Sequence, residues 1–297
     1  ARKGRKADGD NFLKVVLVLG CFLMVLILIV GSNVHPNEEG GVDEAKEGFW
    51  GEITANVDWC EQNYAVTYYI AEFWNTISNI NYILGGILLI LWHPEAELRY
   101  MVLFASVIVL GFGSALFHGS LLFSFQLCDE VPMFITTACF YYIGHEHENI
   151  VAKSAILPWA MTAAMAIFTV LYSIYQFATL FQMTYGVVTI ATIVQLIRIT
   201  STVPPKDRVV LQGSVICFLI SMTLWILEQA LCSPSIRLFR LHAWWHVGTA
   251  YTVYSAGAGM LYIRYRNILK KRNARIEYRL GFLPVAVFDR PSKLPVS

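Results

Sequence analysis

The sequence predicts an all-α polytopic membrane protein, because its apolar residues are too many and too regularly grouped for a soluble domain. Of its 297 residues, 56% are hydrophobic and only 14% are charged, whereas ordinary soluble domains carry about 25% charged residues. The mean hydropathy is +0.53. The apolar residues form blocks of roughly twenty, the length of helix that crosses about 30 Å of hydrocarbon. No basic patch with interleaved aromatic residues points to nucleic acid as a partner.

The first hydrophobic segment, near Val15–Val30, stands apart from the others along the chain. Its basic start and its apolar run of about seventeen residues also fit a signal peptide, but no small-residue cleavage site follows, so an uncleaved anchor is favoured. A polar stretch from Asn33 to Asn63 separates this segment from seven further spans. The expected fold is therefore a seven-transmembrane helix bundle with an additional N-terminal hydrophobic segment.

The seven further spans follow one another with short links. They are predicted near Tyr68–Trp92, Tyr100–Phe123, Val131–Ile143, Ala155–Tyr172, Phe177–Leu196, Val209–Leu231 and Ala243–Tyr262. Polar residues interrupt the third of these, so Leu127 is an alternative start for it. Links as short as "HPEAEL" and "LFSFQL" imply antiparallel neighbours within one bundle.

Basic residues orient the bundle, because cytosolic loops carry an excess of Lys and Arg. The basic residues Arg2, Lys3, Arg5 and Lys6 precede the first segment, and six follow the last one between residues 264 and 275, so both ends are expected in the cytosol. The opposite side has links without basic residues, with Lys46, Arg237 and Arg240 as exceptions. Three regions are expected. Residues 1–48 form a basic N-terminus, an anchor or signal segment and a linker, residues 49–263 form the bundle, and residues 264–297 form a basic cytosolic C-terminal tail.

Five polar side chains converge at the non-cytosolic ends of three predicted spans. They are Ser114, His118, Asp129, His242 and His246. Neutral imidazoles at one depth favour a zinc ion with an open fourth position, whose bound water has a pKa of about 7. The carboxyl would then move a proton, and the hydroxyl would stabilise an oxyanion. The alternatives are helix–helix hydrogen bonds for the histidines, which three converging rings make less favoured, and a packing role for Ser114.

A second polar cluster lies in "DWCEQNYAVTYYIAEFWNTISN". Its hard oxygen donors, which suit Ca²⁺, are Asp58, Glu61, Asn63 and Glu72. The alternative is a solvated acidic loop with one buried carboxyl. From Glu72 to Asn79 polar residues recur at helical spacing, so this face is predicted to look into the bundle. Cys60 and Cys232 both fall on the non-cytosolic side, where an oxidising compartment allows a disulfide.

Four segments together resemble the alkaline ceramidases, a family of seven-helix intramembrane hydrolases of the endoplasmic reticulum and Golgi. The segments are "WGEITANVDWCEQNYAVTYYIAEFWNTISN", "GSALFH", "QLCDEVPM" and "FRLHAWWH". The resemblance runs from about Phe49 to Phe288 and includes "LGFLPVAVF". It does not include the first 48 residues, since family members with seven spans usually lack the first hydrophobic segment.

The resemblance implies two metal sites and two catalytic residues. It implies zinc on His118, His242 and His246, with Ser114 and Asp129 as catalytic partners. It also implies a calcium site formed by Asp58, Glu61, Asn63 and Glu72, with the carbonyl of Trp59 as a further ligand. A bridge between Cys60 and Cys232 fits the family as well.

The expected function is zinc-dependent hydrolysis of the ceramide amide to sphingosine, or a related sphingoid base, and a fatty acid. The enzyme is expected in the membrane of the endoplasmic reticulum or Golgi, with a lumenal active site and a cytosolic C-terminus. Ceramide and membrane lipid are the expected partners, and no obligate protein partner is evident. Two alternatives are a receptor of the progestin and adiponectin receptor type and a hydrolase that remodels lipid-anchored proteins. The "DWCEQN" cluster favours the ceramidase.

Overall fold

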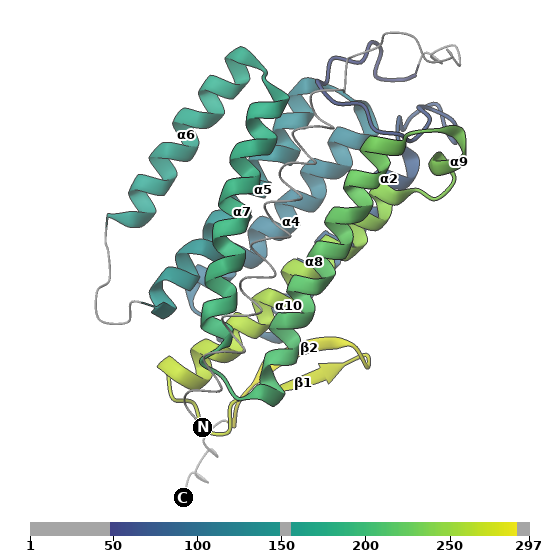
Figure 1. The fold of residues 1–297 in the computed structure, drawn as a ribbon. Helices are drawn as coiled ribbons and strands as arrows, with labels where there is room; N and C mark the ends of the chain where they lie inside the picture. Colours follow the sequence, from purple (N-terminus) through teal and green to yellow (C-terminus); the bar gives the residue numbers. More distant parts are fainter. Residues whose placement is uncertain (1–47, 149–155, 290–297) are drawn as a thin grey trace, which may run out of the picture.

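The computed structural model describes residues 48–148 and 156–289. This part of the chain is mostly helical, and its long helices form one bundle (Figure 1). The elements in order are α2 (Phe73–Ser78), α3 (Ile80–Trp92), α4 (Leu98–Ser120), α5 (Phe123–Glu148), α6 (Leu157–Tyr175), α7 (Ala178–Thr200), α8 (Pro205–Leu231), α9 (Pro234–Arg237), α10 (Leu241–Ile263), η1 (Arg264–Ile268), β1 (Arg275–Arg279) and β2 (Leu283–Val287). The predicted segment near Val15–Val30 lies outside the described residues.

Five helical segments within the described residues are long and apolar enough to cross a membrane. They are Phe73–Trp92, which comprises α2 and α3, and the helices α4, α6, α7 and α8. α5 and α10 have 26 and 23 residues but carry buried polar side chains such as Asp129 and His246. These helices agree with the all-α membrane architecture that the composition predicts.

The link between α4 and α5 is shorter than the sequence suggests, and α5 is correspondingly longer. Leu121 adopts left-handed backbone angles, with φ at 54°, and its N–H closes the last turn of α4. α5 then begins at Phe123, ahead of both predicted starts, Val131 and Leu127. Asp129 consequently lies inside α5 instead of at its entrance.

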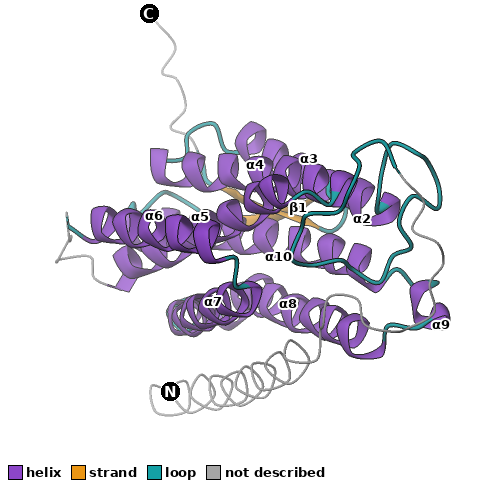
Figure 2. Cartoon of the chain, turned by 90° about the horizontal axis from the view of Figure 1, so that it is seen from above, coloured by secondary structure: helices purple, strands orange, loops and turns teal. Residues whose placement is uncertain are grey.

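α10 occupies the middle of the bundle, where it packs against α8 on one side and against α3 and α4 on the other (Figure 2). Small residues permit this packing, since Gly257 faces Phe104 of α4 and Gly259 faces Leu211 of α8. α6 lies on the outside of the bundle and is largely exposed. Because helices surround α10, its polar side chains point to protein and not to lipid.

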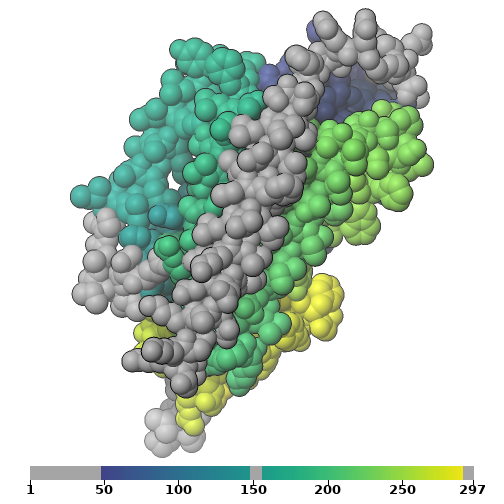
Figure 3. Space-filling model, viewed as in Figure 1, coloured from purple at the N-terminus to yellow at the C-terminus, as the bar shows by residue number. Residues whose placement is uncertain are grey.

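A β-hairpin follows α10, in the region that the sequence marks only as a basic tail. Its strands β1 and β2 are antiparallel, and Figure 3 shows the hairpin, in yellow, at the surface beside α8, in green. Ala286 N–H donates to His93 Nε2 at 3.1 Å, and the Tyr254 hydroxyl donates to Pro284 O at 3.1 Å. The hairpin is thus fastened to the end of α3 and to the flank of α10.

A disulfide joins the loop before α2 to the end of α8. It links Cys60 to Cys232 across 172 residues, with a Cα–Cα distance of 5.6 Å. The prediction of this bridge is confirmed. The loop that starts at residue 48 is therefore held against the end of the bundle where α10 begins.

Candidate metal centre and active site

Three buried histidines form a cluster that could hold a metal ion. His118 comes from the end of α4, and His242 and His246 come from the first turns of α10. One ring nitrogen from each lies within 4.8 Å of the others, and the three residues are 1%, 2% and 3% exposed. The two histidines of α10 share a face because they are four residues apart.

Two of the rings are held through Nδ1, which leaves Nε2 for a ligand. His118 Nδ1 lies 2.5 Å from a carboxylate oxygen of Glu72. His246 Nδ1 lies 2.8 Å from Ser78 Oγ and 3.1 Å from the carbonyl oxygen of Asn75. Metal-ligating histidines almost always use their other nitrogen in this way.

The third ring supports the same interpretation. His242 stacks on Trp59, with ring centroids 3.8 Å apart, and its Nδ1 has no hydrogen-bond partner within residues 48–148 and 156–289. A buried polar atom without a partner calls for an unseen ligand such as an ion or a water. Three imidazole nitrogens with one open position are the donor set of a catalytic zinc ion.

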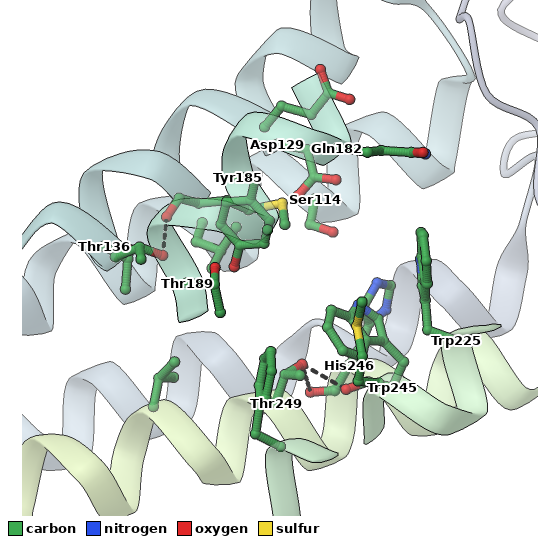
Figure 4. A pocket seen from close by; sticks show the side chains of 18 of the residues that line it. Ser114, Asp129, Thr136, Gln182, Tyr185, Thr189, Trp225, Trp245, His246 and Thr249 are labelled. Atoms are coloured by element: carbon green, nitrogen blue, oxygen red, sulfur yellow. Dashed lines mark hydrogen bonds between the residues drawn. The ribbon is translucent and has the colours of Figure 1, made fainter. Parts of the chain in front are cut away.

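Ser114 and Asp129 lie across a cavity from this cluster (Figure 4). Ser114 precedes His118 by one turn of α4, and Asp129 of α5 lines the same cavity as Ser114. The close approach of the two helices depends on Gly113, because a Cβ there would collide with the carbonyl group of Cys128. The structure therefore brings a hydroxyl, a carboxyl and the imidazoles of His242 and His246 to one cavity, and the His118 imidazole clusters with these two.

The cavity continues between α5, α7, α8 and α10 as a mainly apolar channel. A second cavity shares Phe140, Ile193 and Phe218 with the first and extends to Met260, near the other end of α10. Met260 is fourteen residues beyond His246, a rise of about 21 Å along an α-helix. A cavity of this length with polar groups at one end suits a lipid with a polar head and a long chain.

The predicted calcium ligands lie beside the histidine cluster. Asn63 Nδ2 donates to both oxygens of Asp58 at 3.1 and 3.0 Å, and Asn63 Oδ1 has no partner in the described part of the chain. Burial, with the neighbouring Glu72 as the second cause, raises the pKa of Asp58 to about 7. The neighbouring carboxyls of Asp58 and Glu72 and an unpartnered amide oxygen fit an oxygen-liganded cation.

Glu61, the remaining predicted carboxyl ligand, has another use in the structure. Its two oxygens accept the backbone N–H groups of Trp74 and Asn75 at 2.8 and 2.9 Å, at the N-terminus of α2. Burial raises the pKa of Glu61, which these hydrogen bonds partly offset. Trp59, whose carbonyl is the further predicted ligand, donates its N–H to Glu72 Oε1 at 2.9 Å.

Two residues at the site were not predicted from the sequence. Ser78 holds His246, as described above, and Glu228 of α8 accepts the N–H of Cys60 at 3.2 Å. Glu228 stands in the apolar run "LWILEQAL", where an ionisable residue is costly. A single carboxyl within an apolar run was therefore the sequence signal that could have identified Glu228. The sequence offers no such signal for Ser78, because Ser is common where membrane helices pack.

Comparison with known proteins places these residues in one family. A family model described as Ceramidase matches residues 51–287, which confirms the predicted extent of the resemblance. "Alkaline ceramidase 3" of Mus musculus is 30% identical over 270 residues, covering 84% of this chain and 97% of that protein. "Alkaline ceramidase" of Arabidopsis thaliana is 27% identical over 254 residues, covering 82% of this chain and 96% of that protein.

Proposed function

Since the chain belongs to the ceramidase family, we infer that it hydrolyses the amide bond of ceramide at the cavity where the three histidines meet Ser114 and Asp129. The products are a sphingoid base and a free fatty acid. The observation that carries this proposal is the cluster of three buried imidazoles from two helices, of which His242 and His246 line one cavity with Ser114 and Asp129. The receptor and the lipid-remodelling hydrolase are not favoured, because the matched proteins carry the name ceramidase.

Zinc is the metal that this donor set fits, and when bound it would polarise the amide carbonyl and make hydroxide available near neutral pH. Glu72 and Ser78 hold the imidazoles of His118 and His246 in orientation for it. Asp129 takes the proton of the attacking water and returns it to the departing amine nitrogen. Ser114 donates a hydrogen bond to the oxygen that gains charge during the attack.

A calcium ion is proposed for the neighbouring loop, with Asp58, Asn63 and Glu72 as ligands. Glu61 and the carbonyl of Trp59 belong to the same proposed set. The Asn63 Oδ1 atom, which has no partner in the described residues, and the Asp58 carboxyl beside Glu72 support this assignment. In this position calcium would stabilise the loop that carries Trp59 against His242.

The proposed topology has seven spans in the described bundle. α5 and α10 complete the five apolar segments, and the segment near Val15–Val30 adds a further anchor or signal in region 1–48. The bundle of residues 49–263 is proposed to lie in the membrane of the endoplasmic reticulum or Golgi. Its active site faces the lumen, where an oxidising compartment agrees with the disulfide. Residues 264–297, with their hairpin, then lie in the cytosol.

The test replaces one imidazole and follows both product and metal. Purified His246→Ala is expected to bind less than one zinc per chain and to release no sphingoid base from ceramide. Mass spectrometry of products from ceramide, phospholipid and glycolipid defines the substrate, and elemental analysis measures zinc. His145→Ala, which removes an imidazole from the last turn of α5, is the matched control. It is expected to retain both zinc binding and ceramide hydrolysis. Normal ceramide hydrolysis by zinc-free His246→Ala would contradict the proposal.

A further inference from the structure

Glu130 is a buried carboxyl in the same cavity to which the mechanism assigns no role. It follows Asp129 in α5, lines the cavity and is only 8% exposed. A carboxyl inside a membrane helix is costly to bury, so its retention there calls for a function.

One carboxylate oxygen of Glu130 is held by the side-chain amide of Gln126, whose N–H and C=O groups all form hydrogen bonds. Glu130 Oε1 accepts Gln126 Nε2 at 2.9 Å, and the same nitrogen donates to the Tyr172 hydroxyl at 3.0 Å. Gln126 Oε1 accepts the N–H of Asn56 at 2.8 Å. Because both donors and the acceptor of Gln126 are used, its orientation is determined, and it fixes the Glu130 carboxyl in turn.

The other oxygen, Glu130 Oε2, has no hydrogen-bond partner among the residues that the structure describes. The Tyr172 hydroxyl also interacts with this carboxyl, but Glu130 still retains an unused acceptor. Buried acceptors in native proteins are nearly always satisfied, so a donor is expected from what enters the cavity.

Ceramide carries donors of the required kind close to its amide. The carbon that bears the amide nitrogen lies between two carbons that each carry a hydroxyl. Glu130 is the residue after Asp129 on α5 and lines the same cavity, which would bring a sphingoid hydroxyl near it when the amide lies at Asp129. We propose that Glu130 accepts a hydrogen bond from a hydroxyl of the sphingoid base and so selects hydroxylated substrates. This proposal rests on the ceramide hydrolysis assigned above.

The experiment compares ceramide with its 1-deoxy and 3-deoxy analogues in detergent micelles. In the wild type, the kcat/KM of one analogue is expected to be about 10–100-fold lower than that of ceramide. This is the range expected from the loss of one hydrogen bond to a charged group. In Glu130→Gln the amide N–H₂ replaces the accepting oxygen, so ceramide itself loses a similar factor. The selectivity between ceramide and that analogue then falls to about threefold or less. A merely structural role would lower the turnover of all three substrates alike.

Glu146→Gln, the same change near the other end of α5, is the matched control and is expected to keep the wild-type selectivity. Zinc content and melting temperature of both variants are measured in parallel. Equal kcat/KM of the wild type for ceramide and both analogues would overturn the proposal without any variant. Unchanged selectivity in Glu130→Gln would overturn it as well. Failure of the wild type to cleave ceramide would instead contradict the proposed function.

Discussion

At the scale of single residues, the Glu72 carboxylate joins the two candidate metal sites. Its Oε2 lies 2.5 Å from His118 Nδ1, and its Oε1 accepts the N–H of Trp59. A carboxylate on the far nitrogen of a ligating imidazole fixes the ring and increases its basicity. Because a substitution of Glu72 would disturb both sites, residues that belong to only one of them are better probes.

Asp129→Asn separates proton transfer from shape. The amide preserves the size of the side chain but cannot take a proton, so kcat is expected to fall by about 10²–10⁴-fold. Release of sphingoid base measures this. Ser114→Ala is expected to cost about 10²–10³-fold if the hydroxyl only supports the oxyanion. A burst of acyl-enzyme on Ser114 would make it a nucleophile and would contradict this division of roles.

The residues proposed to carry the chemistry could be identified from the sequence, whereas Ser78, which holds one of them, could not. His118, Asp129 and the histidines of α10 are ionisable groups in apolar spans, so they stand out individually. Ser78 reaches His246 across 168 residues of sequence, and this contact exists only because α2 packs on α10. His93, for which the sequence indicated no role, is fully buried because the hairpin covers it.

At the scale of elements, the crossing of α4 and α5 determines where Ser114 meets Asp129. Gly113 is the contact point, and a Cβ at this position would overlap the carbonyl group of Cys128 on α5. An obstacle formed by backbone cannot rotate away as a flexible side chain can. The two helices must therefore separate if residue 113 carries a side chain.

Gly113→Ala is expected to lower both stability and activity. Overpacking of this kind typically costs about 1–3 kcal/mol, which exceeds the gain in helix propensity of about 1 kcal/mol from replacing glycine. Thermal unfolding in detergent and kcat measure the two effects. Gly213→Ala is the matched control, because nothing lies within 4 Å of the added Cβ on α8. A melting temperature of Gly113→Ala equal to that of Gly213→Ala would contradict the close contact.

The sequence located helices better than it located their ends. α10 was predicted within two residues of its bounds, because Arg240 and Arg264 border a mostly apolar run that contains no Lys, Arg, Asp or Glu. α5 was predicted too short, since Gln126, Asp129 and Glu130 break the apolar pattern although the helix continues through them. Polar residues that face a cavity give the same local pattern as a loop, and only packing distinguishes the two.

At the scale of the whole molecule, the loop before α2 is fastened over the end of the bundle that contains the site. The Cys60–Cys232 bridge closes a loop whose cross-linking contributes about 5 kcal/mol in the chain-entropy model. Glu228 accepts the N–H of Cys60, and Arg240 lies 3.9 Å from Glu61. The segments that enclose the metal centre thus come from distant parts of the chain.

Calcium is expected to stabilise this arrangement, because a ligand that binds only the folded state adds to the free energy of unfolding. At about one hundred times the dissociation constant the gain is about 2.7 kcal/mol. Adding calcium to chelated protein should raise the melting temperature of the wild type but not of Asp58→Ala. Glu52→Ala, a change of an exposed carboxyl in the same loop, should respond like the wild type. Equal melting temperatures with and without calcium in the wild type would count against the site.

The 172 residues between Cys60 and Cys232 also determine when the enzyme becomes active during its synthesis. A ribosome adds about 5–20 residues per second, so roughly 10–35 s pass between the two cysteines. Throughout that interval the growing chain has an unpaired Cys60 and at most one of the three clustered imidazoles, since His242 and His246 follow Cys232. A chain terminated before its last helix therefore lacks the proposed ligand set, and by the proposed mechanism hydrolysis begins only when translation is nearly finished.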